Sequence, residues 1–115
     1  MHEMGVATEI VEIAKEAIPG DAPEARVARL TLKVGKLSSV VPQSLRFSFD
    51  VVAMGTPLDG AELVIEEIPV EAMCRECQHQ WTITGPVFIC PQCQSGKVKL
   101  LSGQELYIES IELAE

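Results

Sequence analysis

Four cysteines lie in two C-x-x-C pairs, a spacing typical of a site that binds one metal ion. The first pair, "CREC", is Cys74 and Cys77, and the second, "CPQC", is Cys90 and Cys93. Each turn brings two sulfurs to one ion while its backbone amides can donate to the thiolates. Two such turns complete the tetrahedral set that zinc prefers in structural sites, with no open position for catalysis. The spacing therefore predicts a structural Zn²⁺.

Three other uses of the four thiols compete with zinc. Nothing in the sequence suggests export, and cytosolic thiols stay reduced, so a disulfide framework is disfavoured. A thioredoxin-type redox site normally needs one C-x-x-C pair and not two. A rubredoxin-like iron site uses similar turns, including a C-P-x-C, so iron stays open as an alternative metal.

Two ring side chains accompany the cysteines. His79 follows the first pair, and the only tryptophan, Trp81, lies close behind it. With four thiolates available, we interpret His79 as a solvated loop residue rather than as a ligand of a second metal. We expect Trp81 to pack over the two turns as the small core of this segment. Gly96 fits a tight turn after the second pair.

The sequence before the cysteines changes from a helical to a strand pattern. Residues 4–18 place apolar side chains at helical spacing and stop at Pro19-Gly20, which predicts a helix. Between residues 24 and 35 the period changes to two, which predicts a half-buried strand. The side chains expected to face the core are Met4, Ala7, Ile10, Val11, Ala14, Ala17 and Ile18 in the helix, and Ala28, Leu30, Leu32 and Val34 in the strand.

A second helix is predicted from Pro42, whose missing N–H costs nothing in a first turn, to the breaker residues Gly55 and Pro57. Residues 61–70 predict another strand. The tail at 104–113 has strand-like composition, but its alternation slips near Ser110. The expected inward side chains are Val41, Leu45, Phe49 and Val52 in the helix, and Leu63, Ile65 and Ile68 in the strand.

These elements predict an α+β fold in which a small mixed sheet with two helices carries an inserted zinc-ribbon module with four cysteine ligands. The main domain comprises residues 1–70 and 101–115, and the module comprises residues 71–100. The strand at 61–70 leads into the module and the last strand leads out of it. We therefore expect these two strands to pair as neighbours.

The chain of 115 residues is acidic, with a formal net charge of −8. An acidic surface repels phosphate backbones, so we expect no nucleic-acid binding and favour cations or a basic protein as partners. No apolar run approaches the ~18 residues of a membrane span, and no signal peptide is recognisable, so we expect a cytoplasmic protein without membrane attachment. No Ser/His/Asp or Cys/His set and no phosphate-binding loop stands out, so we expect no enzyme.

The motifs taken together are more specific than the cysteine pairs alone. The chain begins "MHE", continues with "LTLKVGKLSSVVPQSLRFSFDVVAMGT" at residues 30–56, and then carries "AELVIEEIPVEAMCRECQ" and "CPQCQS". These stretches resemble the HypA/HybF family of hydrogenase maturation proteins, the nickel metallochaperones, over essentially the whole chain. The resemblance implies a nickel-binding domain and a zinc domain. It also implies delivery of Ni²⁺ to the large-subunit precursor of [NiFe]-hydrogenase together with the GTPase HypB, and some members also serve urease.

The resemblance gives a role to His2, one of the two histidines. Without the resemblance, a histidine at a chain terminus would indicate little about function. It implies a nickel site at Met1, His2 and Glu3. Ni²⁺ suits square-planar or tetragonal nitrogen donors. The terminal amine, the main-chain nitrogen of His2 and its imidazole can close two chelate rings, and the Glu3 main-chain nitrogen is the fourth donor that the family implies. The competing function is a zinc-ribbon adaptor that binds protein partners without carrying nickel.

Overall fold

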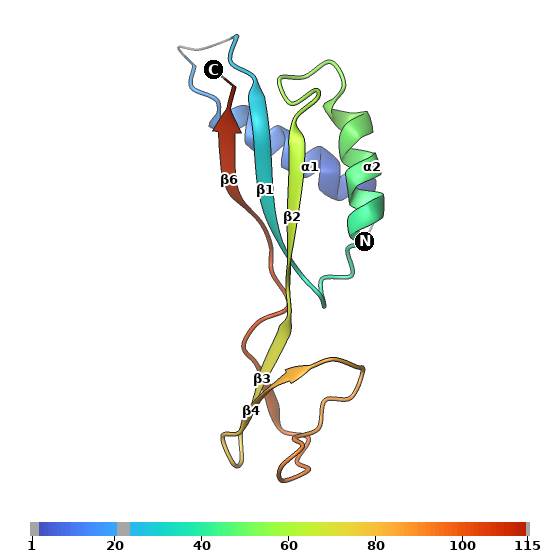
Figure 1. Cartoon of the computed structure of the whole chain (residues 1–115), viewed down its shortest axis with the longest axis vertical. Coiled ribbons are helices and arrows are strands. Elements are labelled where there is room, and N and C mark those ends of the chain that lie inside the picture. The colour runs from blue at the N-terminus through green and yellow to red at the C-terminus, as the bar shows by residue number, and fades with distance from the viewer. Residues whose placement is uncertain (1–2, 21–23, 115) are drawn as a thin grey trace.

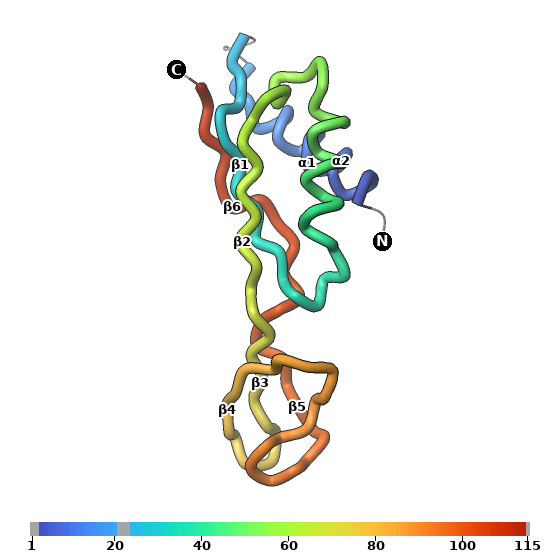
Figure 2. The backbone as a smooth tube through the Cα atoms, turned by 45° about the vertical axis from the view of Figure 1, so that its right-hand side comes forward, coloured from blue at the N-terminus to red at the C-terminus, as the bar shows by residue number. Residues whose placement is uncertain are grey.

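The computed structural model describes residues 3–20 and 24–114, which form two small sheets placed end to end (Figure 1, Figure 2). The molecule measures 57 × 25 × 17 Å, and its radius of gyration is 17.9 Å, against about 13 Å for a compact chain of this length. None of the described helices is long and apolar enough to cross a membrane. The elements are α1 (Glu3–Ala17), β1 (Val27–Gly35), α2 (Pro42–Ala53), β2 (Glu62–Ile68), β3 (Val70–Cys74), β4 (Gln80–Ile83), β5 (Val98–Leu100) and β6 (Leu106–Leu113).

The first sheet has the strand order β2-β1-β6 and is mixed, as predicted. β1 runs parallel to β2 and antiparallel to β6. The expectation that the strand at 61–70 and the last strand pair with each other is wrong, because β1 lies between them. The side chains of Leu30, Leu32 and Val34 in β1 are at most 1% exposed. A central place gives this apolar strand a hydrogen-bonded neighbour on both sides.

α1 and α2 pack against each other and close one hydrophobic core with the sheet. Four side chains predicted to face this core are instead exposed, namely Met4, Ala17, Ala28 and Val41. Met4 and Ala17 belong to the end turns of α1. Val41 precedes α2 with an extended backbone, and Ala28 lies where the register between β1 and β6 shifts. Each of these exceptions therefore falls at an end or an irregularity of its element.

The slip expected near Ser110 is a bulge in β6. Thr31 pairs with Ser110, whereas the next residue of β1, Leu32, pairs with Ile108. Glu109 is therefore the extra residue, as in a β-bulge. The bulge keeps Ile108 and Ile111 packed against the core on the same face of the sheet.

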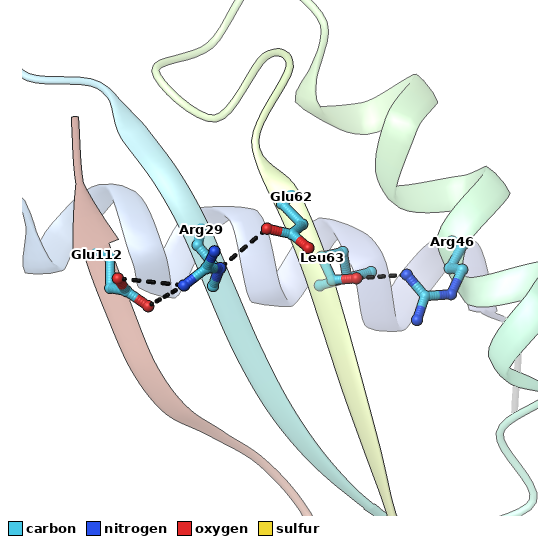
Figure 3. A network of polar contacts seen from close by, with 5 residues as sticks. All are labelled: Arg29, Arg46, Glu62, Leu63 and Glu112. Atoms are coloured by element: carbon cyan, nitrogen blue, oxygen red, sulfur yellow. Dashed lines mark hydrogen bonds and ion pairs between the residues drawn. The ribbon is translucent and has the colours of Figure 1, made fainter.

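Ion pairs cover the other face of the sheet and link its three strands (Figure 3). Nε of Arg29 in β1 lies 2.9 Å from Glu62 in β2, and its Nη1 lies 3.1 Å from Glu112 in β6. Hydrogen bonds from Arg29 to Glu62 and Glu112 raise the pKa of Arg29 above its ordinary value. The second bridge of this kind is Lys33 with Glu66 and Glu109. Because Arg29 and all four carboxylates are exposed, these pairs favour the register more than they stabilise the fold.

The two outer edges of the sheet differ. Along β2, Nη1 of Arg46 in α2 donates a hydrogen bond to the carbonyl oxygen of Leu63 (Figure 3). Along β6, no side chain within residues 3–20 and 24–114 bonds to the backbone of Leu106 or Ile108. An uncovered edge strand can pair with another chain.

The two sheets meet in a short junction of backbone contacts. Pro69 separates β2 from β3, so the strand predicted at 61–70 is divided between the two sheets. The N–H of Gly35 donates to the carbonyl of Glu105 at 2.7 Å, and that of Leu37 donates to the carbonyl of Gly103 at 2.7 Å. A side chain at position 35 would overlap Gly103, so the close approach requires glycine. These contacts tie the end of β1 to the segment that leads from the second sheet into β6.

Candidate metal centre

The second sheet, with the strand order β4-β3-β5, leads directly into the cysteines. β3 pairs antiparallel with both neighbours and ends at Cys74. The described core of this sheet comprises Val70, Ala72 and Ile83, with Trp81, Val98 and Leu100 packed partly against it. Trp81 therefore joins the small core of the module, as predicted, whereas its packing over the two turns stays a prediction. A core of this size needs a metal or another cross-link to stay folded.

Each C-x-x-C turn directs backbone N–H groups at its first sulfur. The N–H groups of Glu76 and Cys77 donate to Sγ of Cys74 at 3.4 Å each. In the second turn, the N–H groups at the two corresponding positions donate to Sγ of Cys90, also at 3.4 Å each. Such bonds favour the thiolate, which is the form that binds a metal.

A second pair of backbone bonds closes each turn. The N–H of Gln78 donates to the carbonyl of Cys74 at 2.9 Å, and the N–H of Cys74 donates to the carbonyl of His79 at 2.8 Å. The second turn repeats both bonds. The N–H of Gln94 donates to the carbonyl of Cys90 at 2.8 Å, and the N–H of Cys90 donates to the carbonyl of Ser95 at 2.9 Å. The two C-x-x-C turns of the centre thus have the same hydrogen-bond pattern.

The residue after each pair adopts a left-handed backbone. Gln78 has φ 63° and Gln94 has φ 64°. Gly96, which we expected in the tight turn, is not the left-handed residue. A non-glycine residue in this region costs about 1–2 kcal/mol, which the bonds to the preceding cysteines offset. Glutamine does not usually adopt this conformation. Only the position of each glutamine, directly after the second cysteine of a pair, could have indicated a left-handed backbone.

The four sulfurs converge on one point. All four Sγ atoms lie within 4.8 Å of one another, with 3.4 Å between Cys74 and Cys93 and 3.6 Å between Cys77 and Cys90. These distances exceed the ~2.05 Å of a disulfide. They suit a tetrahedral ion with Zn–S bonds of about 2.3 Å, which sets neighbouring sulfurs ~3.8 Å apart. The residues present therefore fit a structural metal ion bound by four thiolates.

The crowding of the sulfurs separates their pKa values. The N–H of Cys77 and then that of Glu76 lower the pKa of Cys74 to about 7, although burial raises it. The N–H of Ser95 lowers the pKa of Cys93, but the neighbouring Cys74 sulfur and burial raise it more strongly, to about 12. Four thiolates this close together require a cation, and a bound divalent ion supplies that charge.

His79 lies beside the centre without joining the cluster of sulfurs. Its ring stacks on Trp81, with centroids 5.8 Å apart and planes at 9°. His79 lies in the loop before β4, as expected, but its side chain is half-buried rather than fully solvated. The stack extends the small core of the module up to the first C-x-x-C turn.

Of the three expected nickel ligands, the structure describes Glu3. Met1 and His2 lie outside the described residues, and Glu3 is the first residue of the helix. Oε2 of Glu3 accepts a hydrogen bond from the N–H of Val41 at 3.1 Å, just before α2 begins. The first turn of α1 is therefore anchored beside the start of α2 (Figure 2). The first N–H groups of a helix have no acceptor within it, so a metal can replace their protons without breaking a helical bond.

Comparison with known protein families places the whole chain in one of them. A family model described as "Hydrogenase/urease nickel incorporation, metallochaperone, hypA" matches residues 1–113. The chain belongs to the HypA family. The match includes both the N-terminal residues expected to bind nickel and the four cysteines. The HypA family is thus one of nickel-incorporation metallochaperones, and the resemblance seen in the sequence is confirmed.

Individual relatives match this chain over its full length. The chain is 56% identical to the hydrogenase maturation factor HypA of Desulfosudis oleivorans over 115 residues, which is 100% of both chains. It is 52% identical to the hydrogenase maturation factor HypA of Desulfatibacillum aliphaticivorans, over 100% of this chain and 88% of that one.

Two solved structures share the fold. The solution structure of the Ni metallochaperone HypA from Helicobacter pylori has a TM-score of 0.67 at 22% identity and covers 98% of this chain and 97% of its own. A second solution structure of a HypA protein has a TM-score of 0.71 at 22% identity, and the match covers 99% of this chain and 97% of that one. The α+β fold, with its mixed sheet, two helices and cysteine module, is therefore confirmed.

Proposed function

We propose that this chain carries Ni²⁺ in the cytoplasm to the large-subunit precursor of [NiFe]-hydrogenase, together with the GTPase HypB, and does so without catalysing a reaction. The observation that carries the proposal is the family match over residues 1–113. Nickel binds the domain formed by residues 1–70 and 101–115, and zinc holds the module at 71–100. Metal analysis before and after added nickel tests it: the purified chain should contain zinc, and should gain nickel that a chelator removes without loss of zinc.

The nickel site comprises Met1, His2 and Glu3. The terminal amine and the main-chain nitrogen of His2 close a five-membered ring on the ion, and the imidazole Nδ1 closes a six-membered ring. The main-chain nitrogen of Glu3 completes a plane of four nitrogen donors, a geometry that suits Ni²⁺. A planar site of this kind leaves the ion accessible from above and below, as transfer to a partner requires.

The Glu3 carboxylate positions this site. A cation at a helix N-terminus meets the positive end of the helix dipole, which weakens its binding. The carboxylate adds a negative charge there, and its bond to the Val41 N–H links the first turn of α1 to α2. Glu3 therefore contributes charge and orientation through its side chain, in addition to its main-chain nitrogen.

We expect Glu3→Ala to weaken nickel binding by about tenfold, within the 10–100-fold range typical of groups that orient metal ligands. Glu3→Gln keeps the acceptor for the Val41 N–H and should lose less affinity. Isothermal titration of each variant with Ni²⁺ measures the effect. The matched control is Glu16→Ala, an exposed carboxylate on the same helix. Equal nickel affinities for Glu3→Ala and Glu16→Ala would show that the Glu3 side chain does not contribute to the site.

Zinc has a structural role in this proposal. Bound by Cys74, Cys77, Cys90 and Cys93, it neutralises the crowded thiolates and cross-links the two C-x-x-C turns. The chain itself supplies the orientation, through the N–H groups that donate to the first sulfur of each pair.

HypB contacts the acidic side of α1, close to the nickel site. Glu9, Glu12 and Glu16 are exposed along this helix. Replacing all three with lysine should weaken the complex with HypB by at least about tenfold, because opposed charges govern both encounter and register at such an interface. Surface plasmon resonance with immobilised HypB measures the change.

A second triple variant controls for net charge. Glu24→Lys, Asp50→Lys and Glu67→Lys change exposed residues elsewhere on the molecule. Both triple variants move the formal net charge from −8 to −2. Only the α1 variant should lose affinity. If both variants bind HypB equally well, the contact lies on another surface.

A further inference from the structure

A groove borders the last strand and shares one lining residue, Glu9, with the α1 surface proposed for HypB. It lies between α1 and β6 and has a volume of about 210 Å³. Its walls are mostly apolar, and the one charged side chain among its lining residues is Glu9. The apolar walls include Val6, Ile10 and Ile13 from α1 and Leu106 and Ile108 from β6.

Within residues 3–20 and 24–114, no strand pairs with β6 on the side away from β1. Glu105, just before β6, accepts a hydrogen bond from Gly35 in β1. Because backbone groups in an antiparallel pair alternate between the two sides, those of Leu106 and Ile108 point away from β1. β6 is an edge strand of 8 residues. None of the described side chains bonds to its outer edge at Leu106 or Ile108 in the way that Arg46 bonds to Leu63 in β2.

Apolar side chains lie exposed beside this open edge. Ile13 is 51% exposed, Tyr107 is 53% exposed and Leu106 is 36% exposed. Edge strands in natural proteins are usually protected by charges, by proline or by a covering element. An open edge next to a small apolar groove is the arrangement that domains use to bind an extended peptide as an added strand.

Charge selects the occupant. Glu9 lines the groove, and Glu12 and Glu16 are exposed further along the same helix. The chain as a whole carries a formal net charge of −8. A second copy would bring the same carboxylates against one another, whereas a basic segment would pair with them. The charge therefore favours a basic partner over self-association.

We propose that β6 and the α1–β6 groove bind an extended segment of a partner protein in which apolar and basic residues alternate. The segment adds to the sheet as a strand beside β6. Its apolar side chains enter the groove between Ile13 and Ile108, since alternate residues of a strand share one face. A basic side chain at the rim pairs with Glu9. This inference goes beyond nickel carriage. The groove shares Glu9 with the surface proposed for HypB, but the test below uses neither HypB nor nickel.

The test uses a synthetic peptide and the whole zinc-loaded chain without nickel. The probe is a fluorescein-labelled peptide as long as β6 that alternates valine and lysine, and its control replaces each lysine with glutamate. Fluorescence anisotropy measures affinity. Amide hydrogen exchange followed by NMR locates the site, and binding should slow exchange at Leu106 and Ile108 at least about tenfold.

Variants test the two walls of the groove. Ile13→Lys and Glu9→Lys should each weaken peptide binding by about tenfold or more, the loss expected for a central contact or a close charge pair. Phe47→Lys is the matched control, because Phe47 on α2 is 69% exposed and lies outside the lining of the groove. All three positions are exposed, so the variants should keep the wild-type circular dichroism spectrum.

Several results would overturn the proposal. These are the absence of binding, equal binding of the valine–glutamate peptide, or exchange protection outside β6 and α1. Affinity that falls as much in Phe47→Lys as in Ile13→Lys would also overturn it, as a general charge effect. A dimer in sedimentation that Ile13→Lys dissociates would assign the groove to a second copy instead.

Discussion

Adding residues before Met1 abolishes nickel binding while zinc stays bound: this is the largest effect that we expect from a change in covalent structure. An extension turns the terminal amine into an amide and removes one nitrogen donor without altering any side chain. His2→Ala should have the same result, because it removes the imidazole. Equilibrium dialysis with Ni²⁺, followed by metal analysis, measures both ions in each variant.

The chain offers a matched control for each change. The same extension placed after Glu115 should leave nickel binding intact. His79→Ala removes the other histidine, which stacks on Trp81 in the module, and should also leave nickel bound. Undiminished nickel affinity in the N-terminally extended chain would falsify the main-chain chelate, and equal losses in His2→Ala and His79→Ala would remove the special role of position 2.

The same site predicts a dependence on pH. The terminal amine and the imidazole have reference pKa values of about 7.7–8.0 and ~6.5, and both must lose their protons to bind the ion. Nickel affinity should therefore fall as the pH drops through this range. Titrations of the wild-type chain with Ni²⁺ at several pH values measure this fall, and an affinity that stays constant across the range would contradict the chelate.

Replacing one cysteine should unfold the module and leave the main domain folded. In Cys90→Ser the metal loses one of its four ligands and the N–H groups of the second turn lose their acceptor. Binding of structural zinc is worth about 10–16 kcal/mol in small zinc domains. The module's own core, with Val70, Ala72 and Ile83 buried, cannot replace that contribution. NMR should show collapsed amide dispersion for residues 71–100 and unchanged shifts for α1 and α2.

Ile89→Ser is the control for this prediction, because Ile89 precedes Cys90 and is 49% exposed. It introduces the same residue next to the centre and should keep both zinc and native dispersion. Removal of the metal from the wild type with a strong chelator should reproduce the spectrum of Cys90→Ser. Metal analysis of the untreated protein distinguishes zinc from iron. Native dispersion in Cys90→Ser with stoichiometric zinc would show that the four cysteines do not form the site.

Features that depend on neighbouring residues could be predicted from the sequence. The helix at 4–18, the helix from Pro42 and the strand ending at Gly35 follow from local periodicity and stop signals. The convergence of the four cysteines follows from the geometry of two short turns. The slip near Ser110 is visible because a bulge breaks the alternation of the strand.

Features that depend on packing between distant elements could not be predicted in this way. The place of β1 between β2 and β6 reflects how deeply each strand is buried, which periodicity within one strand does not record. The left-handed Gln78 and Gln94 depend on the bonds that close each turn and on no preference of glutamine. The fold, rather than the residue type, sets both conformations.

By itself, the sequence determined which residues are expected to bear the chemistry, namely the MHE start and the four cysteines, and which helices and strands present them. Only the tertiary structure decided where these residues lie relative to one another. It brings Glu3 to Val41 across 38 positions of the chain. It also covers the edge of β2 with Arg46 and leaves that of β6 open. The physical reason is that turns and periodicity act over a few residues, whereas such contacts form only when the whole core packs.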